Sequence, residues 1–234
     1  LPVALGGTSS VNATGGALTF TAAISSAASN LTLTGSSTIT LGGLSFAGTG
    51  NVVTTTAAEV RLVGDSTLAA DLLVNDGTVR MQSGTQVFSN GLKVDGTSSV
   101  LSFEGASITV TGINGGNSLS GESLEIVNSG TLNVSAGMVD VTPSRFWMQA
   151  GTLNITGGTM NMNNTLIAQN GSVTSRINVS GGTLSLGGGN RFANNGTAIL
   201  TVSGTGVVSW AVSSYGLSEN GTASIIMDGG TMNI

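Results

Sequence analysis

Five segments in the C-terminal half of the chain are variants of one short pattern, in which an alternating apolar and polar run leads into a turn and a second alternating run. They begin at Leu132, Leu153, Ile177, Leu200 and Ile225, so successive copies lie 21, 24, 23 and 25 residues apart. A period in the low twenties is too short for two helices, but it fits one coil of a chain with inward apolar and outward polar side chains. The repeat therefore predicts a parallel β-solenoid in which each copy forms one coil.

The N-terminal half carries the same signal in a less regular form. Short β-rich runs bounded by Gly, Asn, Asp or Ser continue through it, and residues 74–78 and 94–97 echo each other about one coil apart. No segment shows helical periodicity. We therefore predict an all-β fold with one domain over residues 1–234, a single-stranded right-handed parallel β-solenoid (β-helix) of about ten coils. Residues 1–129 are expected to form degenerate coils and residues 130–234 regular coils.

Charged residues are scarce in this chain, and few of them are basic, which argues against nucleic acid as a partner. Charged residues make up 7% of the 234 residues, with six Lys plus Arg against eleven Asp plus Glu and a net charge of −5. Binding to phosphates requires a basic stripe, so we do not expect nucleic acid as a partner. Gly, Ser, Thr or Asn interrupts every apolar run within a few residues, so no segment is predicted to span a membrane as a helix.

The chain contains no Cys and no His, so thiolate nucleophiles, imidazole bases and imidazole metal ligands are absent. We predict no catalytic residue, no cofactor and no metal site. A polysaccharide lyase or hydrolase on this scaffold would need carboxylates and a basic residue together on neighbouring coils. Asp76 and Asp95 occupy equivalent places one coil apart and would stack as a cation site or an acid–base pair. The alternative is two solvated residues in turns that favour Asp-Gly.

Asn-Gly pairs recur at a spacing of 25 residues and mark one corner of successive coils. Gly adopts the positive φ that a sharp corner needs, and stacked Asn amides can bond to one another. A second set of glycines, each followed by Thr, marks another corner by the same reasoning. We interpret both sets as structural, with a ligand-binding row of amides as the alternative for the asparagines. The predicted corner ladder consists of Asn170, Asn195, Asn220, Gly158, Gly182 and Gly230.

The aromatic residues of the C-terminal half have two interpretations. Exposed on one face they would form a strip on which sugars stack, and inside the coils they would fill the core. Because aromatic residues are only 4% of the chain, the core is the favoured interpretation. The residues concerned are Phe146, Trp147, Phe192, Trp210 and Tyr215.

The phrase Gly-Thr-Leu-Asn-Val/Ile-Ser/Thr-Gly-Gly-Thr-Leu/Met, with variants at residues 130–138, 151–160 and 181–186, resembles the repeats of bacterial autotransporter passengers and of the related PEP-CTERM-associated surface proteins. The resemblance covers residues 130–234 well and the first half loosely. It implies an exported bacterial protein that is extracellular or on the cell surface. Adhesion and structural roles are common in that family.

Both ends of the chain are apolar and almost uncharged, and the first 58 residues contain no charged side chain. The terminal coils of a solenoid expose unpaired backbone groups, and charged edge residues are the usual protection against strand addition. We therefore expect the ends to stack on other copies of the chain, head to tail. The predicted interface consists of Leu1, Val3, Leu5, Met232 and Ile234.

These observations together indicate a non-catalytic structural subunit of an extracellular bacterial fibre or surface stalk. The alternative is an adhesin or glycan-binding passenger segment of a longer exported protein, which would add glycans to the partners. A polysaccharide lyase or hydrolase is the third interpretation.

Overall fold

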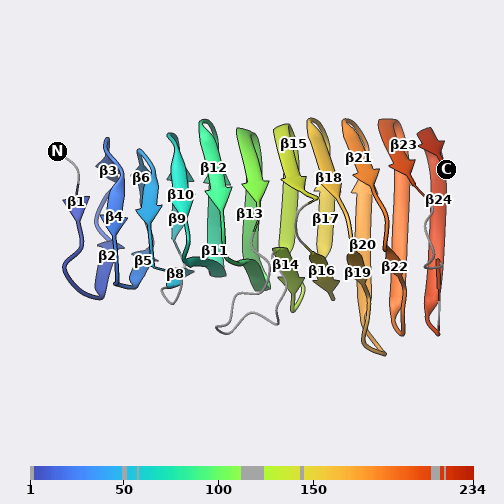
Figure 1. The fold of residues 1–234 in the computed structure, drawn as a ribbon, viewed down its shortest axis with the longest axis horizontal. Helices are drawn as coiled ribbons and strands as arrows, with labels where there is room; N and C mark the ends of the chain where they lie inside the picture. Colours follow the sequence, from blue (N-terminus) through green and yellow to red (C-terminus); the bar gives the residue numbers. More distant parts are fainter. Residues whose placement is uncertain are drawn as a thin grey trace.

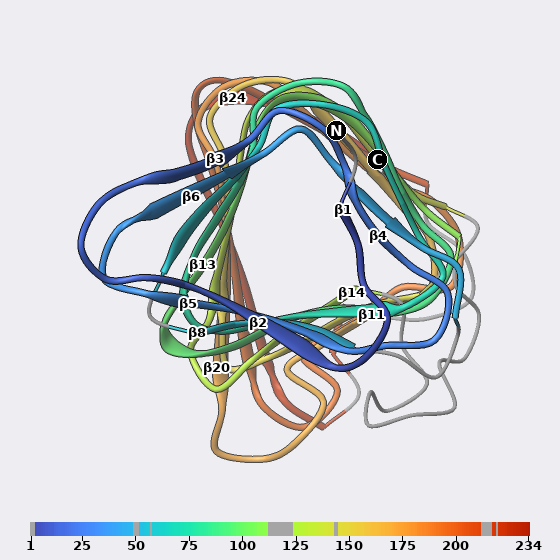
Figure 2. The same ribbon diagram turned by 90° about the vertical axis from the view of Figure 1, so that its left-hand side faces the viewer.

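The computed structural model describes residues 3–48, 52–56, 58–111, 124–142, 145–211, 217–218 and 220–234. These residues form β-strands and no helix, and the strands wind into an elongated right-handed parallel β-solenoid (Figure 1). The predicted all-β solenoid is thus confirmed. Seen along its axis, successive coils superimpose on a three-sided outline (Figure 2). Nothing helical in the described ranges has the length and hydropathy needed to cross a bilayer.

Each side of this outline is a parallel sheet, and the three sheets are called faces 1, 2 and 3 in the order in which the chain enters them. Face 1 contains β1 (Val3–Ala4), β4 (Ile24–Ser26), β7 (Leu44–Phe46), β10 (Ser66–Leu68), β12 (Thr85–Phe88), the ends of β13 (Leu92–Val110) and β15 (Thr131–Val141), β18 (Thr159–Met162), β21 (Thr183–Leu186), and the ends of β23 (Thr197–Trp210) and β24 (Thr222–Asn233). Face 2 contains β2 (Ser9–Ala13), β5 (Leu31–Gly35), β8 (Val52–Thr56), the starts of β11 (Asp71–Met81) and β13, β14 (Leu124–Val127), β16 (Phe146–Gln149), β19 (Thr165–Ile167) and β22 (Arg191–Phe192).

Face 3 contains β3 (Leu18–Phe20), β6 (Thr38–Leu41), β9 (Glu59–Leu62), the end of β11, the middle of β13, the start of β15, β17 (Thr152–Ile155), β20 (Thr174–Val179), and the starts of β23 and β24. Within the described residues this face therefore has ten members, one for each coil, in agreement with the predicted number of about ten. Parallel strands this close in sequence are possible because each coil returns to the same face after one circuit of the axis.

Inward side chains from the three faces fill the interior of the solenoid. In β17, Leu153 and Ile155 are fully buried, and the residues that alternate with them are half-buried. Met160 and Met162 are also fully buried and lie in register with Leu184 and Leu186 of the next coil, so these methionines fill the core as a leucine does elsewhere in the repeat.

The structure divides the predicted aromatic set between core and surface. Phe146 and Phe192 are fully buried, and Trp210 is nearly so, with its ring centroid 5.6 Å from that of Phe192. Trp147 alternates with Phe146 and is half-buried on the outside of face 2. Tyr215 lies outside the described residues. These positions give no exposed aromatic strip along a face in the described part of the chain.

Coil length varies along the solenoid, whereas the pairing register is kept. Leu101 pairs with Leu132, 31 residues further on, and Leu132 then pairs with Leu153 after 21 residues. The additional length enters between β13 and β14, where residues 112–123 lie outside the described ranges. Insertions are therefore taken up at a corner, and the inward and outward sets of side chains are preserved on both sides of it.

Candidate functional site

A row of hydrogen-bonded polar side chains runs along the outside of face 3 over six consecutive coils, from β9 to β20. Its strand positions are in register from Arg61 through Arg80 and onward. Because outward residues two apart in a strand share a side of the sheet, neighbouring positions add further polar groups to this row. We call this row the polar ladder, and it consists of Glu59, Arg61, Arg80, Gln82, Ser102, Glu104, Asn133, Asn154 and Asn178.

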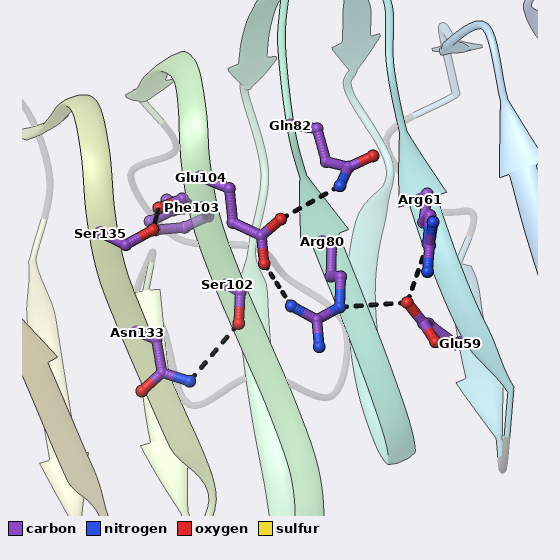
Figure 3. A network of polar contacts seen from close by, with 9 residues as sticks. All are labelled: Glu59, Arg61, Arg80, Gln82, Ser102, Phe103, Glu104, Asn133 and Ser135. Carbon is purple, nitrogen blue, oxygen red and sulfur yellow. Dashed lines mark hydrogen bonds and ion pairs between the residues drawn. The ribbon is translucent and has the colours of Figure 1, made fainter.

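Ion pairs form the N-terminal part of the polar ladder (Figure 3). Glu59 Oε1 accepts hydrogen bonds from Arg61 Nε at 2.9 Å and from Arg80 Nε at 3.1 Å. Arg80 Nη1 also donates to Glu104 Oε1, and the other oxygen of Glu104 accepts from Gln82 Nε2 at 3.1 Å. Arg80 thus joins carboxylates on the coils before and after its own.

The neighbours of Arg80 in this network act on its pKa. The hydrogen bond to Glu104 raises the pKa of Arg80; partial burial opposes this effect, and the charges of Glu104 and Glu59 add to it. Arg80 is therefore held as a cation. The side chains remain between 22% and 42% exposed, so water screens their attraction and each ion pair contributes little to stability.

Amides form the C-terminal part of the polar ladder. Asn154 Nδ2 donates to Asn133 Oδ1 at 2.9 Å, and Asn178 Nδ2 donates to Asn154 Oδ1 at 2.9 Å. At the junction with the charged part, Asn133 Nδ2 donates to Ser102 Oγ at 3.4 Å (Figure 3). Asn133 and Asn154 each donate through Nδ2 and accept through Oδ1 along the solenoid axis, and Asn178 donates in the same direction, so the amide dipoles are aligned.

Reasoning from the sequence did not identify the polar ladder, although the signal is present. Glu59 and Arg80 are 21 residues apart, and Arg80 and Glu104 are 24 apart, each about one coil. Likewise, Asn133 and Asn154 hold the same position in their repeats. The signal is thus a set of complementary polar residues separated by one coil on outward positions.

The predicted corner asparagines do not all occupy one level. Asn195 and Asn220 lie in register on consecutive coils, since each precedes a Gly-Thr pair and Thr197 pairs with Thr222. Their amides do not bond to each other; Asn195 Nδ2 instead donates to the carbonyl oxygen of Gln169 at 2.9 Å.

Asn170 is offset from that column by two residues. After its Gly the chain adds residues 172 and 173, and pairing starts at Thr174, which lies in register with Thr197. The extra residues make the corner at Asn170 an exposed turn that projects beyond the coils on either side.

The predicted corner glycines lie over one another on the corner that precedes face 1. Gly158, Gly182 and Gly230 have φ angles of 69°, 69° and 68°. A Cβ atom added to Gly182 would lie 2.5 Å from the carbonyl oxygen of Gly158, and one added to Gly158 would lie 2.6 Å from that of Gly137. The left-handed conformation and the close approach of successive coils both require glycine at this corner.

The Asp76 and Asp95 pair is displaced by one residue from the predicted stack. Asn75, not Asp76, lies in register with Asp95. Asp95 accepts from Asn128 Nδ2 at 2.7 Å and forms an ion pair with Lys93 at 3.0 Å. Burial raises the pKa of Asp95, but its hydrogen bonds with Asn128 and Lys93 and the Lys93 charge outweigh burial and lower the pKa below its ordinary value. In the described ranges no group of three or more potential acidic metal ligands comes together.

The Asp71 carboxylate is buried and takes part in no ion pair that the described residues show. Asp71, at the start of β11, is 1% exposed. Its Oδ1 accepts from the Gly91 N–H at 2.8 Å, and its buried Oδ2 has no partner among the described residues. Burial raises the pKa of Asp71, partly opposed by the hydrogen bond from Gly91.

Core side chains are exposed at both ends of the solenoid. On the first coil, Val3 is 37% exposed, whereas Ile24, its partner on the second coil, is fully buried. On the last coil, Met227 is 48% exposed, whereas its partner Val202 is fully buried. The same inward positions are therefore sealed inside the solenoid and open at its ends.

The described residues of the predicted end-to-end interface occupy matching positions. Val3 and Met232 hold the same inward place on face 1, at opposite ends of one column of paired residues. Leu5 and Ile234 follow two residues later on the same side, and Ile234 is 81% exposed. Leu1 lies outside the described residues.

A polar groove lies near the corner that leads into face 2, with a volume of about 280 Å³. Two of the chain's six basic residues line it, and its lining includes no carboxylate from the described residues. A Cβ atom on Gly189 would lie 2.2 Å from Asn164 Oδ1, so glycine there makes room for the Asn164 amide. The lining residues are Arg145, Asn164, Leu166, Gln169, Gly189 and Arg191.

Comparison of the chain with protein-family models, with curated proteins and with solved structures gave no match.

Proposed function

We propose that this solenoid is a non-catalytic structural subunit of an extracellular bacterial fibre or surface stalk, and that copies join head to tail through their end coils. The observation that carries the proposal is the exposure of core side chains at both ends, at positions that are fully buried one coil further in. A second copy continuing the coil would bury them, and burial of apolar surface contributes about 25 cal/mol per Å².

The register of the last coil supports this mode of joining. A new coil that follows β24 in the register of β23 and β24 would place Val3 of one copy on Met232 of the next. On face 3 it would place Leu18 on Ile225, since both continue the inward column of Leu200. Backbone groups at both edges would then pair as they do within the solenoid.

Charge does not oppose this contact. No charged residue occurs before Glu59, and β24 contains only Asp228. Edge strands that must remain unpaired usually carry charges that repel an added strand. A head-to-tail contact is heterologous, so it extends into a filament instead of closing into a dimer.

A structural role is also supported by the chemistry of the polar ladder. Glu59, Arg80 and Glu104 bring carboxylates and a base together on neighbouring coils, which is the arrangement that an enzyme on this scaffold needs. The raised pKa of Arg80 holds it as a cation, however, and it engages both carboxylates. A catalytic base needs a pKa near the working pH. The resemblance of the repeat to autotransporter passengers supports the extracellular placement.

Sedimentation velocity over a series of protein concentrations, with electron microscopy, tests the head-to-tail contact. The parent chain is expected to form polymers that lengthen with concentration, and Met227→Lys is expected to stop them. Ile226→Lys is the matched control: Ile226 is 47% exposed on the same strand but continues the outward column of Thr201, so polymers should persist.

A mixture of two variants sharpens this test. Leu18→Lys blocks the first coil and leaves the last coil intact, whereas Met227→Lys does the reverse. Each variant alone should sediment as a monomer, and the mixture should form dimers that do not grow further. A parent chain that stays monomeric at every concentration, or polymers lost equally with Ile226→Lys, would reject the contact.

The groove gives the second candidate function, binding of an acidic glycan, a specific observation in its favour. Arg145 and Arg191 supply guanidinium groups, which match the geometry of a carboxylate, and Asn164 and Gln169 supply amides for hydroxyl groups. Calorimetric titration with oligouronates tests it. Arg145→Gln and Arg191→Gln should each weaken binding, whereas Arg176→Gln, at an exposed arginine outside the groove, should not. Equal binding of neutral oligosaccharides would contradict an acidic ligand.

A further inference from the structure

The three Asn-Gly pairs at one corner of the solenoid differ in their surroundings, although their sequences are nearly the same. Each pair is followed by Ser or Thr, so their intrinsic reactivity is similar. All three asparagines are exposed, but only Gly171 is exposed with its Asn, whereas Gly196 and Gly221 pack against the preceding coil. The three pairs therefore allow the effect of the folded structure on the reactivity of one motif to be compared within a single molecule.

The pair at Asn170 is exposed and has few contacts. Asn170, Gly171 and Ser172 are exposed and form a turn, and a Cβ atom on Gly171 would meet nothing within 4 Å. Among the described residues, Gly171 N–H has no hydrogen bond and neither does the Asn170 side chain. The Asn170 backbone N–H alone is held, by Gln149 Oε1 at 3.2 Å.

The pair at Asn195 is held by hydrogen bonds. The Gly196 N–H donates to the carbonyl oxygen of Ala168 at 2.8 Å, and Asn195 Nδ2 donates to that of Gln169 at 2.9 Å. The pair at Asn220 is intermediate: its Gly221 N–H has no hydrogen bond among the described residues, but a Cβ atom on Gly221 would lie 2.2 Å from the Gly196 carbonyl oxygen, so the glycine is tightly packed. Both glycines are pressed against the coil before them.

We propose that Asn170 is a site of spontaneous deamidation, selected over Asn195 and Asn220 by the structure. The Gly171 nitrogen loses its proton and attacks Cγ of Asn170; a C–N bond forms, the bond from Cγ to the side-chain nitrogen breaks, and ammonia leaves. Water then opens the resulting succinimide at either carbonyl, which gives an aspartyl or an isoaspartyl residue. No oxidant or reductant takes part.

The reaction needs the Gly nitrogen to be unbonded and free to rotate toward the Asn side chain. Gly171 meets both conditions, whereas Gly196 must first break a backbone hydrogen bond. Breaking this bond is expected to slow the reaction at Asn195 by about fivefold, which corresponds to about 1 kcal/mol, and the packing of Gly196 slows it further. The product adds one negative charge to a turn outside the strand ladder, so the fold is retained.

Incubation of the folded chain in mildly alkaline buffer made with ¹⁸O water, followed by peptide mass spectrometry, tests the proposal. Label should enter first at Asn170, next at Asn220 and last at Asn195, and circular dichroism should show no unfolding. Gly171→Ala is expected to slow the reaction, because the methyl group hinders ring closure. Asn170→Gln should abolish it at this position.

The chain unfolded in urea is the control for intrinsic reactivity. There the three pairs should react at similar rates, so the preference in the folded chain reports structure. Equal rates at Asn170 and Asn195 in the folded chain, or faster reaction at Asn195, would overturn the proposal. The outcome is independent of head-to-tail assembly, because Asn170 lies several coils from either end.

Discussion

Asn154 is the middle residue of the amide part of the polar ladder, and its replacement by Ala is expected to lower stability by an amount that the structure sets. The side chain donates to Asn133 and accepts from Asn178, both at 2.9 Å. A hydrogen bond contributes about 0.5–1.5 kcal/mol net, so the loss of two gives about 1–3 kcal/mol. Asn178→Ala removes only one of these bonds, and its cost should be about half as large.

Asn161 provides the matched control for this measurement. It lies in the next strand of the same coil, points outward and is half-buried, and its side chain has no hydrogen bond among the described residues. Asn161→Ala therefore makes the same chemical change without loss of the ladder. Urea unfolding followed by circular dichroism gives both free energies, and their difference isolates the two hydrogen bonds.

A double variant tests whether the ladder acts as one unit. Asn154→Ala with Asn178→Ala should cost less than the sum of the single changes, because the bond between the two residues is counted in both. Equal losses for Asn154→Ala and Asn161→Ala, or strict additivity in the double variant, would refute the energetic role assigned to the ladder.

Three further changes test other features. Burial raises the pKa of Asp71, so its contribution to the free energy of unfolding is complete below the ordinary pKa of 3.8 and is lost as the pH rises through the raised pKa. Asp71→Asn should therefore raise the midpoint of thermal unfolding at pH 7 but not at pH 3. Gly158→Ala, at a φ of 69°, should cost more than about 1 kcal/mol, whereas Gly171→Ala in open space should change unfolding free energy by less than about 0.5 kcal/mol. Arg80→Gln should cost about 0.2–1 kcal/mol at low salt in the same unfolding assay, and the cost should vanish at high salt because the ion pairs are partly exposed.

The sequence was sufficient for the coil because one physical signal repeats in it. Alternation along each short strand separates inward from outward residues, and the recurrence of Leu132 at Leu153 and Ile177 gives the length of a circuit. Burial confirms this assignment, since all three are fully buried. A repeat length does not, however, state where within the circuit the chain turns, so the three faces appear only in the structure.

The corners were harder to predict because one added residue changes which residues of successive coils lie over one another. The likeness of residues 74–78 to 94–97 suggested that Asp76 and Asp95 stack, but pairing proceeds from Val74 with Val94 and so matches Asn75 with Asp95. In the same way, the equal spacing of Asn170 and Asn195 hid two additional residues after Asn170. Spacing counts residues, whereas stacking depends on backbone register.

The corner between β13 and β14 shows that extra chain can be added to one circuit while Leu101 and Leu132 keep their pairing. A foreign peptide grafted at this corner would lie on the outside of the solenoid and leave its core packing unchanged. In rods joined end to end, such grafts would recur once per subunit, at an axial interval on the order of 50 Å, given about 4.8 Å for each of its coils. The length of the solenoid would thereby set the distance between grafted peptides.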